Sequence, residues 1–309
     1  YAKNQMYTGK HIATKLWVGD YTTGDTFEKF AQKAEGIKRI GVLRADVDNL
    51  GQTFVAGFAG KYATLSRTAA LSRQLSIFFK YYIRSILKNG EYHIDGEKKL
   101  TERNATIVYS GGDDVFIVGA WNEVIELSID LQEKFKKYTQ GTLSISSGIG
   151  IYECTYPIGA IANETGEMEA ESKRMPEKDS VTFMDDGETH LINELEICDG
   201  TYRWEELYKS VLGEKYDVIQ DFLGESDERG MSFLYRMLEL IRNQKEKINF
   251  ARFVYLLSRL EPDKEGEKKE KYRKFSRKMY QWVQSEKDCR ELKTAINLYA
   301  YMHREKGAH

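Results

Sequence analysis

Along the first 186 residues, the spacing of apolar side chains changes repeatedly between the periods of strands and of helices. Residues 37–46, IKRIGVLRAD, are rich in apolar and β-branched side chains and predict a strand. Residues 64–87 instead repeat apolar side chains every three or four positions, as at Leu71, Leu75 and Phe78. That spacing predicts a long amphipathic helix directly after the strand.

The same alternation continues to residue 184. In order, it predicts a strand–turn–strand over residues 105–121, a helix over 124–138, a strand over 142–153, a helix over 158–175 and a short strand over 180–184. The series strand, helix, hairpin, helix, strand is that of the β-α-β-β-α-β ferredoxin-like unit, here with one further helix and strand.

The pattern changes after residue 187, because residues 188–305 are almost all compatible with helix. The sequence therefore predicts an α+β protein in which a ferredoxin-like domain is followed by an all-α helical domain. The expected boundaries are a linker from a preceding domain over residues 1–36, the α+β domain over 37–186 and the helical domain over 187–309.

Composition narrows the class of protein. The 309 residues are 41% hydrophobic and 30% charged with a net charge of −2, so nucleic acid could be attracted only by local patches. No run of about 18 apolar residues is present, so we expect no membrane partner. The three cysteines lie far apart without a CxxC pair, which favours a cytoplasmic protein over a zinc or disulfide protein.

Four aspartates lie at or just beyond the ends of two of the predicted strands. Asp46 and Asp48 would share one face if the first strand continued through Val47, and Asp113 and Asp114 occupy the tip of the predicted hairpin. In a ferredoxin-like sheet these strands are neighbours, so the carboxylates can converge. Such a cluster suits two Mg²⁺ or Mn²⁺ ions that support phosphoryl displacement. An ordinary hairpin turn with solvated acids is the alternative.

Two glycines precede the aspartate pair in the segment YSGGDDVFIVG. Gly111 and Gly112 would permit positive φ angles in the turn and would let a triphosphate approach the backbone. They strengthen the interpretation of this turn as a nucleotide site.

The combination of LRADVDNLG with VYSGGDDVFIVG resembles the polymerase/cyclase palm of the large subunit of type III CRISPR effector complexes, in its Csm-type form. The resemblance implies a nucleotidyltransferase that joins ATP into cyclic oligoadenylates when the complex binds target RNA. It also implies other complex subunits, CRISPR RNA and target RNA as partners.

The family also carries a first palm domain and a nuclease domain with an HD motif. This sequence contains no His-Asp dipeptide and starts shortly before the GGDD palm, so it looks like the C-terminal half of such a subunit. We therefore expect no nuclease activity, and weak or no synthesis by this chain alone.

The resemblance also implies roles for individual residues. Asp46 and Asp113 would bind the metals, Asp114 would bind metal or position the 3′ hydroxyl, and the carbonyl of Val47 is a possible further ligand. Gly111 and Gly112 would border the nucleotide.

Three further residues are weaker nucleotide-binding candidates. Lys173 stands where related palms keep a phosphate-binding lysine, but it could equally form a helical pair with Glu169. Ser110 could line the adenine pocket or simply be a small residue at the turn. Asp48 could be turned away by its neighbour Asn49.

Two other functions remain open. Another GGD-type palm, from a diguanylate cyclase or an RNA polymerase, would share the hairpin motif but lack ADVDNLG. A non-catalytic scaffold would carry the acidic turn as a vestige.

Overall fold

The computed structural model describes residues 19–304, apart from residues 59, 98, 186, 225–228 and 243–246. Contacts divide the chain into two compact units, of which the first ends at Trp204 and the second begins at Glu205. Half of the expected linker, residues 1–18, lies outside the described residues.

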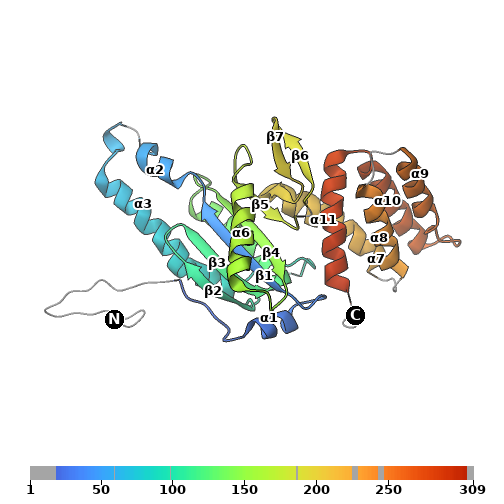
Figure 1. Cartoon of the computed structure of the whole chain (residues 1–309), viewed down its shortest axis with the longest axis horizontal. Coiled ribbons are helices and arrows are strands. Elements are labelled where there is room, and N and C mark those ends of the chain that lie inside the picture. The colour runs from blue at the N-terminus through green and yellow to red at the C-terminus, as the bar shows by residue number, and fades with distance from the viewer. Residues whose placement is uncertain are drawn as a thin grey trace. The chain divides into compact units, whose positions relative to one another are not determined.

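The first unit is a six-stranded sheet with helices packed against it (Figure 1). Its sheet strands are β1 (Ile40–Val47), β2 (Ala105–Ser110), β3 (Asp114–Ala120), β4 (Ile145–Tyr152), β5 (Ser180–Phe183) and β8 (Thr201–Arg203). Its helices are α1 (Phe27–Lys33), α2 (Leu50–Ala56), η1 (Gly60–Tyr62), α3 (Leu65–Ile77), η2 (Phe78–Tyr82), α4 (Ile83–Lys88), α5 (Trp121–Tyr138) and α6 (Ile158–Ser172). The predicted long helix is confirmed: α3, η2 and α4 run without a break.

The strand order in this sheet is β2-β3-β1-β4-β5-β8. Its first four strands are all antiparallel to their neighbours, which is the arrangement that a β-α-β-β-α-β unit produces. Strand β5 adds in parallel to β4, and β8 pairs antiparallel with β5. The predicted α+β class is confirmed, and β1 lies in the interior of the sheet between β3 and β4.

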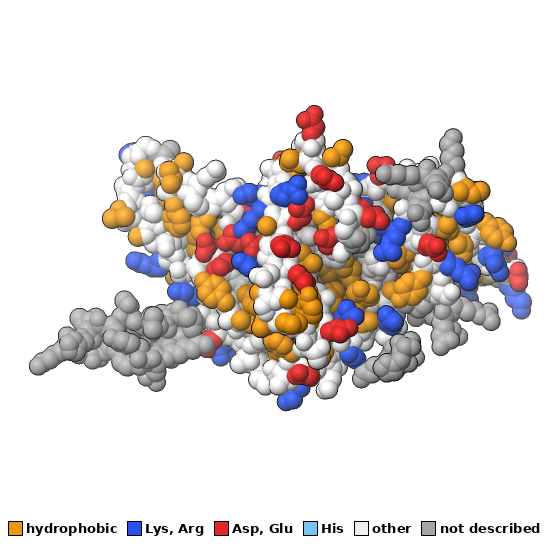
Figure 2. Space-filling model, in the orientation of Figure 1, with side chains coloured by type: hydrophobic (Ala, Val, Ile, Leu, Met, Phe, Trp, Pro, Cys, Tyr) orange, Lys and Arg blue, Asp and Glu red, His pale blue; other side chains and the backbone are white. Residues whose placement is uncertain are grey.

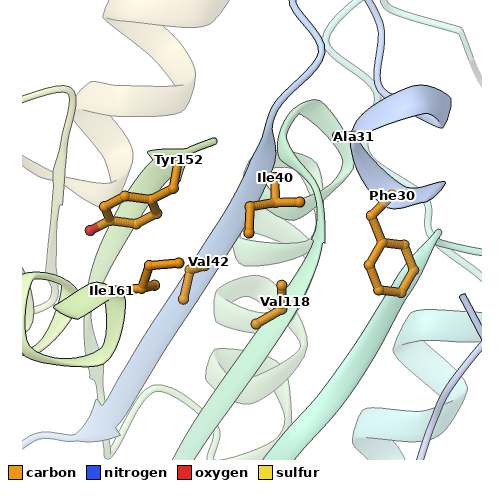
Figure 3. Packing of buried hydrophobic residues seen from close by; sticks show 7 residues of the cluster. All are labelled: Phe30, Ala31, Ile40, Val42, Val118, Tyr152 and Ile161. Atoms are coloured by element: carbon orange, nitrogen blue, oxygen red, sulfur yellow. The ribbon is translucent and has the colours of Figure 1, made fainter. Parts of the chain in front are cut away.

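The two faces of β1 meet different helices. One face belongs to a buried cluster made of Phe30, Ala31, Ile40, Val42, Val118, Tyr152 and Ile161 (Figure 3). On the other face, Gly41 lies so near α5 that a Cβ would come within 2.7 Å of the Cα of Trp121. Since side chains alternate along a strand, Asp46 continues the face that is covered by α6.

Residues 189–203 correct the prediction that helix begins near residue 188. They form β6 (Thr189–Ile192), β7 (Leu195–Cys198) and β8, and β6 and β7 pair as a separate hairpin. The turn between them uses Asn193 and Glu194 with φ of 49° and 67° rather than glycine. Strands of three or four residues are too short to show a period of two, so the sequence pattern missed them.

The second unit contains only helices among its described residues, as predicted for this part of the chain. They are η3 (Glu206–Tyr216), α7 (Asp217–Leu223), α8 (Arg229–Arg242), α9 (Lys247–Ser258), α10 (Glu267–Trp282) and α11 (Glu286–His303). Lys215 of the π-helical η3 is buried and donates to Glu291 at 2.5 Å and to Asp288 at 2.9 Å, which ties η3 to α11. Nowhere in the described part of the chain does a helix combine the length and apolar character needed to cross a membrane.

A buried charge network fixes the start of β2 to α5. The guanidinium of Arg103 donates to Glu126, to Asp130 at 2.8 Å and to the carbonyl of Tyr92 at 2.5 Å. One positive charge therefore serves two carboxylates in a site closed to water. Burial outweighs the attraction of Arg103 and raises the pKa of Glu126 to about 7.

This raised pKa predicts a pH dependence of stability. Glu126 ionises at pH 4.5 when unfolded but holds its proton to about pH 7 when folded. The unfolded state therefore loses the proton first, and the free energy of unfolding falls as pH rises from 4.5 to about 7. Hydrogen exchange of α5 amides should show this decline, and Glu126→Gln should remove it. A decline of equal size in Glu126→Gln would refute the assignment.

Candidate active site

The candidate site lies at the end of β1, where the two acidic motifs meet. Asp46 pairs directly with Asp114 on β3, and with Ser146 on its other side, on β4. Directly paired residues place their side chains on the same face of a sheet. The amide of Val47 donates to the carbonyl of Asp113 at 3.1 Å, so the GGDD turn is fastened to the end of β1. The expected convergence of Asp46 with Asp113 and Asp114 is what the fold produces.

The two glycines of the turn are used differently from the prediction. Neither Gly111 nor Gly112 has a positive φ, so the expectation of left-handed glycines is wrong. Close packing explains Gly111 instead: a Cβ there would overlap the hydroxyl of Tyr109 and sit 2.5 Å from Oδ1 of Asp114. Around Gly112 a Cβ would meet only Ser76, at 4.0 Å, so the backbone there is open to approach.

The clustered carboxylates repel one another. Burial raises the pKa of Asp113, and the nearby charges of Asp46 and Asp114 raise it further, while Lys173 acts in the opposite direction. Asp114 also raises the pKa of the adjacent Tyr109 phenol. A positive charge at this position would relieve the repulsion between the carboxylates.

One such charge already comes from α6. Lys173, at the C-cap of α6, donates to Asp46 and to Glu169, the latter at 2.7 Å. Arg44, two residues before Asp46 on β1, pairs with the same Glu169 at 2.8 Å. The bonds to Asp46 and Glu169 outweigh burial and raise the pKa of Lys173. Figure 2 shows acidic and basic side chains gathered beside α6 on this face.

Of the two alternatives that the sequence left open for Lys173, the helical pair is present, since Glu169 accepts from its ammonium. The same ammonium also contacts Asp46 at the end of β1, which the sequence did not predict. Phosphate binding by Lys173 stays a prediction.

Asp48 and Ser110 lie near the site but have other partners. Strand β1 ends at Val47, and Asp48 directly after it is buried, with only 3% of the residue exposed; the next residue, Asn49, has a φ of 53°. The hydroxyl of Ser110 is buried and donates to the carbonyl of Phe79 at 2.5 Å. The nucleotide roles given to both residues stay predictions.

The donor chemistry of the site fits a hard divalent cation, since Asp46, Asp113 and Asp114 contribute carboxylate oxygens. Within the described residues, however, no three His, Cys, Asp or Glu side chains are arranged as a metal-binding group. The ammonium of Lys173 contacts one of the expected ligands, Asp46.

Sequence reasoning missed three features of the site. Tyr109 is exposed beside Asp114, and Ser146 is fully buried across from Asp46, with a hydroxyl that has no hydrogen-bond partner among the described residues. The third is the ion pair of Arg44 with Glu169. Spacing could have revealed it: Arg44 and Asp46 share a strand face, and Glu169 and Lys173 share a helix face.

Fold and site together define a palm domain of the polymerase/cyclase type, followed by a helical domain. Residues 39–182 match the family model of the Cas10/Cmr2 second palm domain, and residues 220–305 match that of the second helical domain of the Cmr2 subunit of the CRISPR RNA silencing complex. The chain belongs to the Cas10/Csm1 family of type III-A CRISPR systems, so the resemblance seen in the motifs is confirmed.

Individual relatives support this membership. The single-strand-specific deoxyribonuclease Cas10/Csm1 of Mycobacterium tuberculosis is 42% identical over 99% of this chain. A Csm1–Csm4 cassette in complex with pppApApA has a TM-score of 0.68 at 27% identity and covers 92% of this chain and 41% of its own. A Csm1–Csm4 cassette in complex with AMPPNP has a TM-score of 0.66 at 26% identity and covers 91% of this chain and 40% of its own. The chain spans 37% of the length of the Mycobacterium relative.

Proposed function

We propose that this chain is the nucleotidyltransferase part of a type III-A large subunit, which joins ATP molecules 3′ to 5′ into cyclic oligoadenylates. In each step a 3′ oxygen would form a bond to the α-phosphorus of the next ATP, and the bond to pyrophosphate would break. The single observation that carries the proposal is the convergence of Asp46, Asp113 and Asp114 at the end of β1.

Relatives of known structure support the choice of substrate. The cassette that resembles this chain was solved with pppApApA and with AMPPNP. The first of these ligands is what the joining of three ATP molecules would leave before ring closure. These ligands support an adenine nucleotide as the substrate of the proposed site.

The acidic residues would also carry the metal requirement. Asp46, Asp113, Asp114 and the carbonyl of Val47 would hold two Mg²⁺ or Mn²⁺ ions, which would supply positive charge at the attacking oxygen and the leaving pyrophosphate. Asp114, beside the Tyr109 hydroxyl, would help to orient the 3′ hydroxyl.

Lys173 and Gly112 would bind the triphosphate. The ammonium of Lys173 stands at the edge of the acidic cluster and would neutralise phosphate charge once released from Asp46. The open backbone at Gly112 would let the phosphates approach closely. Ser110 and Asp48 would shape the site through their buried bonds.

The partners follow from the family. Csm4 accompanies Csm1 in the related cassettes, and we propose that this chain likewise works inside a complex with other subunits, CRISPR RNA and target RNA. Recognition of transcripts would place that complex in the cytoplasm. The deoxyribonuclease activity in the name of the Mycobacterium relative is not assigned to these residues.

The test is to assemble the complex with the full-length subunit, add target RNA and Mg²⁺, and supply either ATP or GTP. Cyclic adenylates from ATP, detected by mass spectrometry and lost on addition of a chelator, are the expected products. Products from GTP alone would favour a diguanylate cyclase. No product from either nucleotide would favour a scaffold without catalytic activity.

A further inference from the structure

Asp48 lies in the ADVDN segment, directly after the end of β1, and it bonds to two other segments of the chain. Its Oδ2 accepts from the hydroxyl of Ser144 at 2.7 Å and from the backbone amide of Asp179 at 3.1 Å. Its own amide donates to the carbonyl of Ser144 at 2.9 Å. The residue therefore joins the end of β1 to the start of β4 and to the turn before β5.

Burial of the Asp48 side chain is energetically unfavourable. Asp48 is 97% removed from solvent, with 3% of its surface exposed, and its Oδ1 has no hydrogen-bond partner among the described residues. A buried charge is stable only where surrounding donors compensate for lost water. Both compensating bonds lead to other segments, so they hold those segments where they are.

A second contact lies directly beside the first. The ammonium of Lys178 donates to Oδ1 of Asn49 at 2.7 Å. Asn49, Lys178 and Asp179 all have left-handed φ angles, of 53°, 53° and 47°. Such angles are unfavourable for side chains other than glycine and persist only where surrounding contacts impose them. We call these four residues, Asp48, Asn49, Lys178 and Asp179, the turn clamp.

The turn clamp holds both partners of the Lys173–Asp46 contact. Asp46, near the end of β1, precedes Asp48 by two residues, and Lys173, at the C-cap of α6, precedes Lys178 by five residues. The segment between them is short and is itself fixed, because the hydroxyl of Ser180 donates to the carbonyl of Ser172 at 2.5 Å. Movement of this segment away from β1 would carry the ammonium away from the acidic cluster.

We propose that Asp48 is a positioning residue, which acts through the turn clamp to keep Lys173 at the acidic end of β1. The inference rests on the proposed function for its effect on catalysis. It replaces a nucleotide-binding role for Asp48 with a structural cause, since a carboxylate that is this buried and already bonded to two segments is not free for substrate.

The first readout does not depend on activity. Asp48→Asn and Lys178→Ala are introduced into the full-length subunit, and hydrogen exchange is measured over residues 172–180. Both variants should exchange faster in this segment, while Lys137→Ala, an exposed lysine on α5 with a single ion pair at 3.9 Å, should not change it. Lys178→Ala removes a surface contact, so it tests the idea even if Asp48→Asn does not fold. Unchanged exchange in a folded variant would overturn the proposal.

The second readout is a double-mutant cycle on kcat/KM for ATP in the assembled complex. Lys173→Ala removes a charge-assisted contact and should cost about 30-fold, and Asp48→Asn should cost about tenfold. Because Asp48 acts through Lys173, adding Asp48→Asn to Lys173→Ala should cost less than about twofold more. A further tenfold loss on adding Asp48→Asn to Lys173→Ala would overturn the positioning role. A failure of the proposed function itself would be distinguishable, because an Asp113→Asn variant would then keep its activity.

Discussion

Replacement of Asp113 by asparagine in the full-length subunit is expected to lower cyclic oligoadenylate synthesis by the assembled complex about 10²- to 10³-fold. Asparagine keeps the shape of the side chain but removes its negative charge. Asp113 stands where burial and the charges of Asp46 and Asp114 act together, so this one substitution breaks up the acidic cluster. The measurement is the initial rate of product formation from ATP, at saturating target RNA.

The same variant should not be less stable. The folded-state pKa of Asp113 is raised, so its favourable contribution is present at acidic pH and is lost as pH rises through the folded value. At neutral pH the ionised carboxylate therefore works against folding, and asparagine should leave thermal stability equal or higher. Lost activity with retained stability marks a functional position rather than a structural one.

A matched control separates the site from a general effect of charge. Asp95 also lies in a turn, and it accepts from the amide of Glu97 at 2.9 Å, but it is exposed and far along the chain from both motifs. Asp95→Asn makes the same change in net charge and should leave synthesis unchanged. If Asp113→Asn lost no more than Asp95→Asn, the acidic end of β1 would not be the catalytic site.

Most of the fold could be predicted because its elements are long enough to show a period. The run from residue 65 to residue 88 and helix α5 each bury one stripe of apolar side chains, and β1 and β4 are buried on both faces. The strands between residues 189 and 203 were not predicted, because their pairing partners, and not their own side-chain pattern, decide their conformation. Tertiary pairing of this kind leaves almost no local signal.

Within the candidate site, too, the placement of some residues followed from the sequence and that of others did not. The pairing of Asp46 with Asp114 followed from strand order, which the element series already implied. The contacts of Asp48 did not follow, because β1 ends at Val47 and the bonding partners of Asp48, Ser144 and Asp179, come from other segments of the chain. Nor did the contact of Lys173 with Asp46 follow, since only the packing of α6 on β1 brings Asp46 to an ammonium that helical spacing already places beside Glu169.

The largest loss of stability is expected on replacing Arg103 by methionine, which keeps much of the length of the side chain and removes its charge. Arg103 is fully buried, and without it Glu126 and Asp130 lose the cation between them. Breaking a buried pair in this way typically costs about 3–5 kcal/mol, because an uncompensated charge stays inside the protein. Arg103 lies two residues before the start of β2, so this loss would loosen the strand that leads into the GGDD turn.

Hydrogen exchange of amides in α5 and at the start of β2 measures this loss within the first unit. The control is Lys134→Met, since Lys134 pairs with Glu91 at the nearby surface and exposed pairs contribute about 0–1 kcal/mol. The effect of Arg103→Met should also shrink at pH 6, because Glu126 with its pKa of about 7 then holds a proton and needs less compensation. A loss no larger than that of Lys134→Met at pH 8 would show that Arg103 is not what holds the buried carboxylates in place.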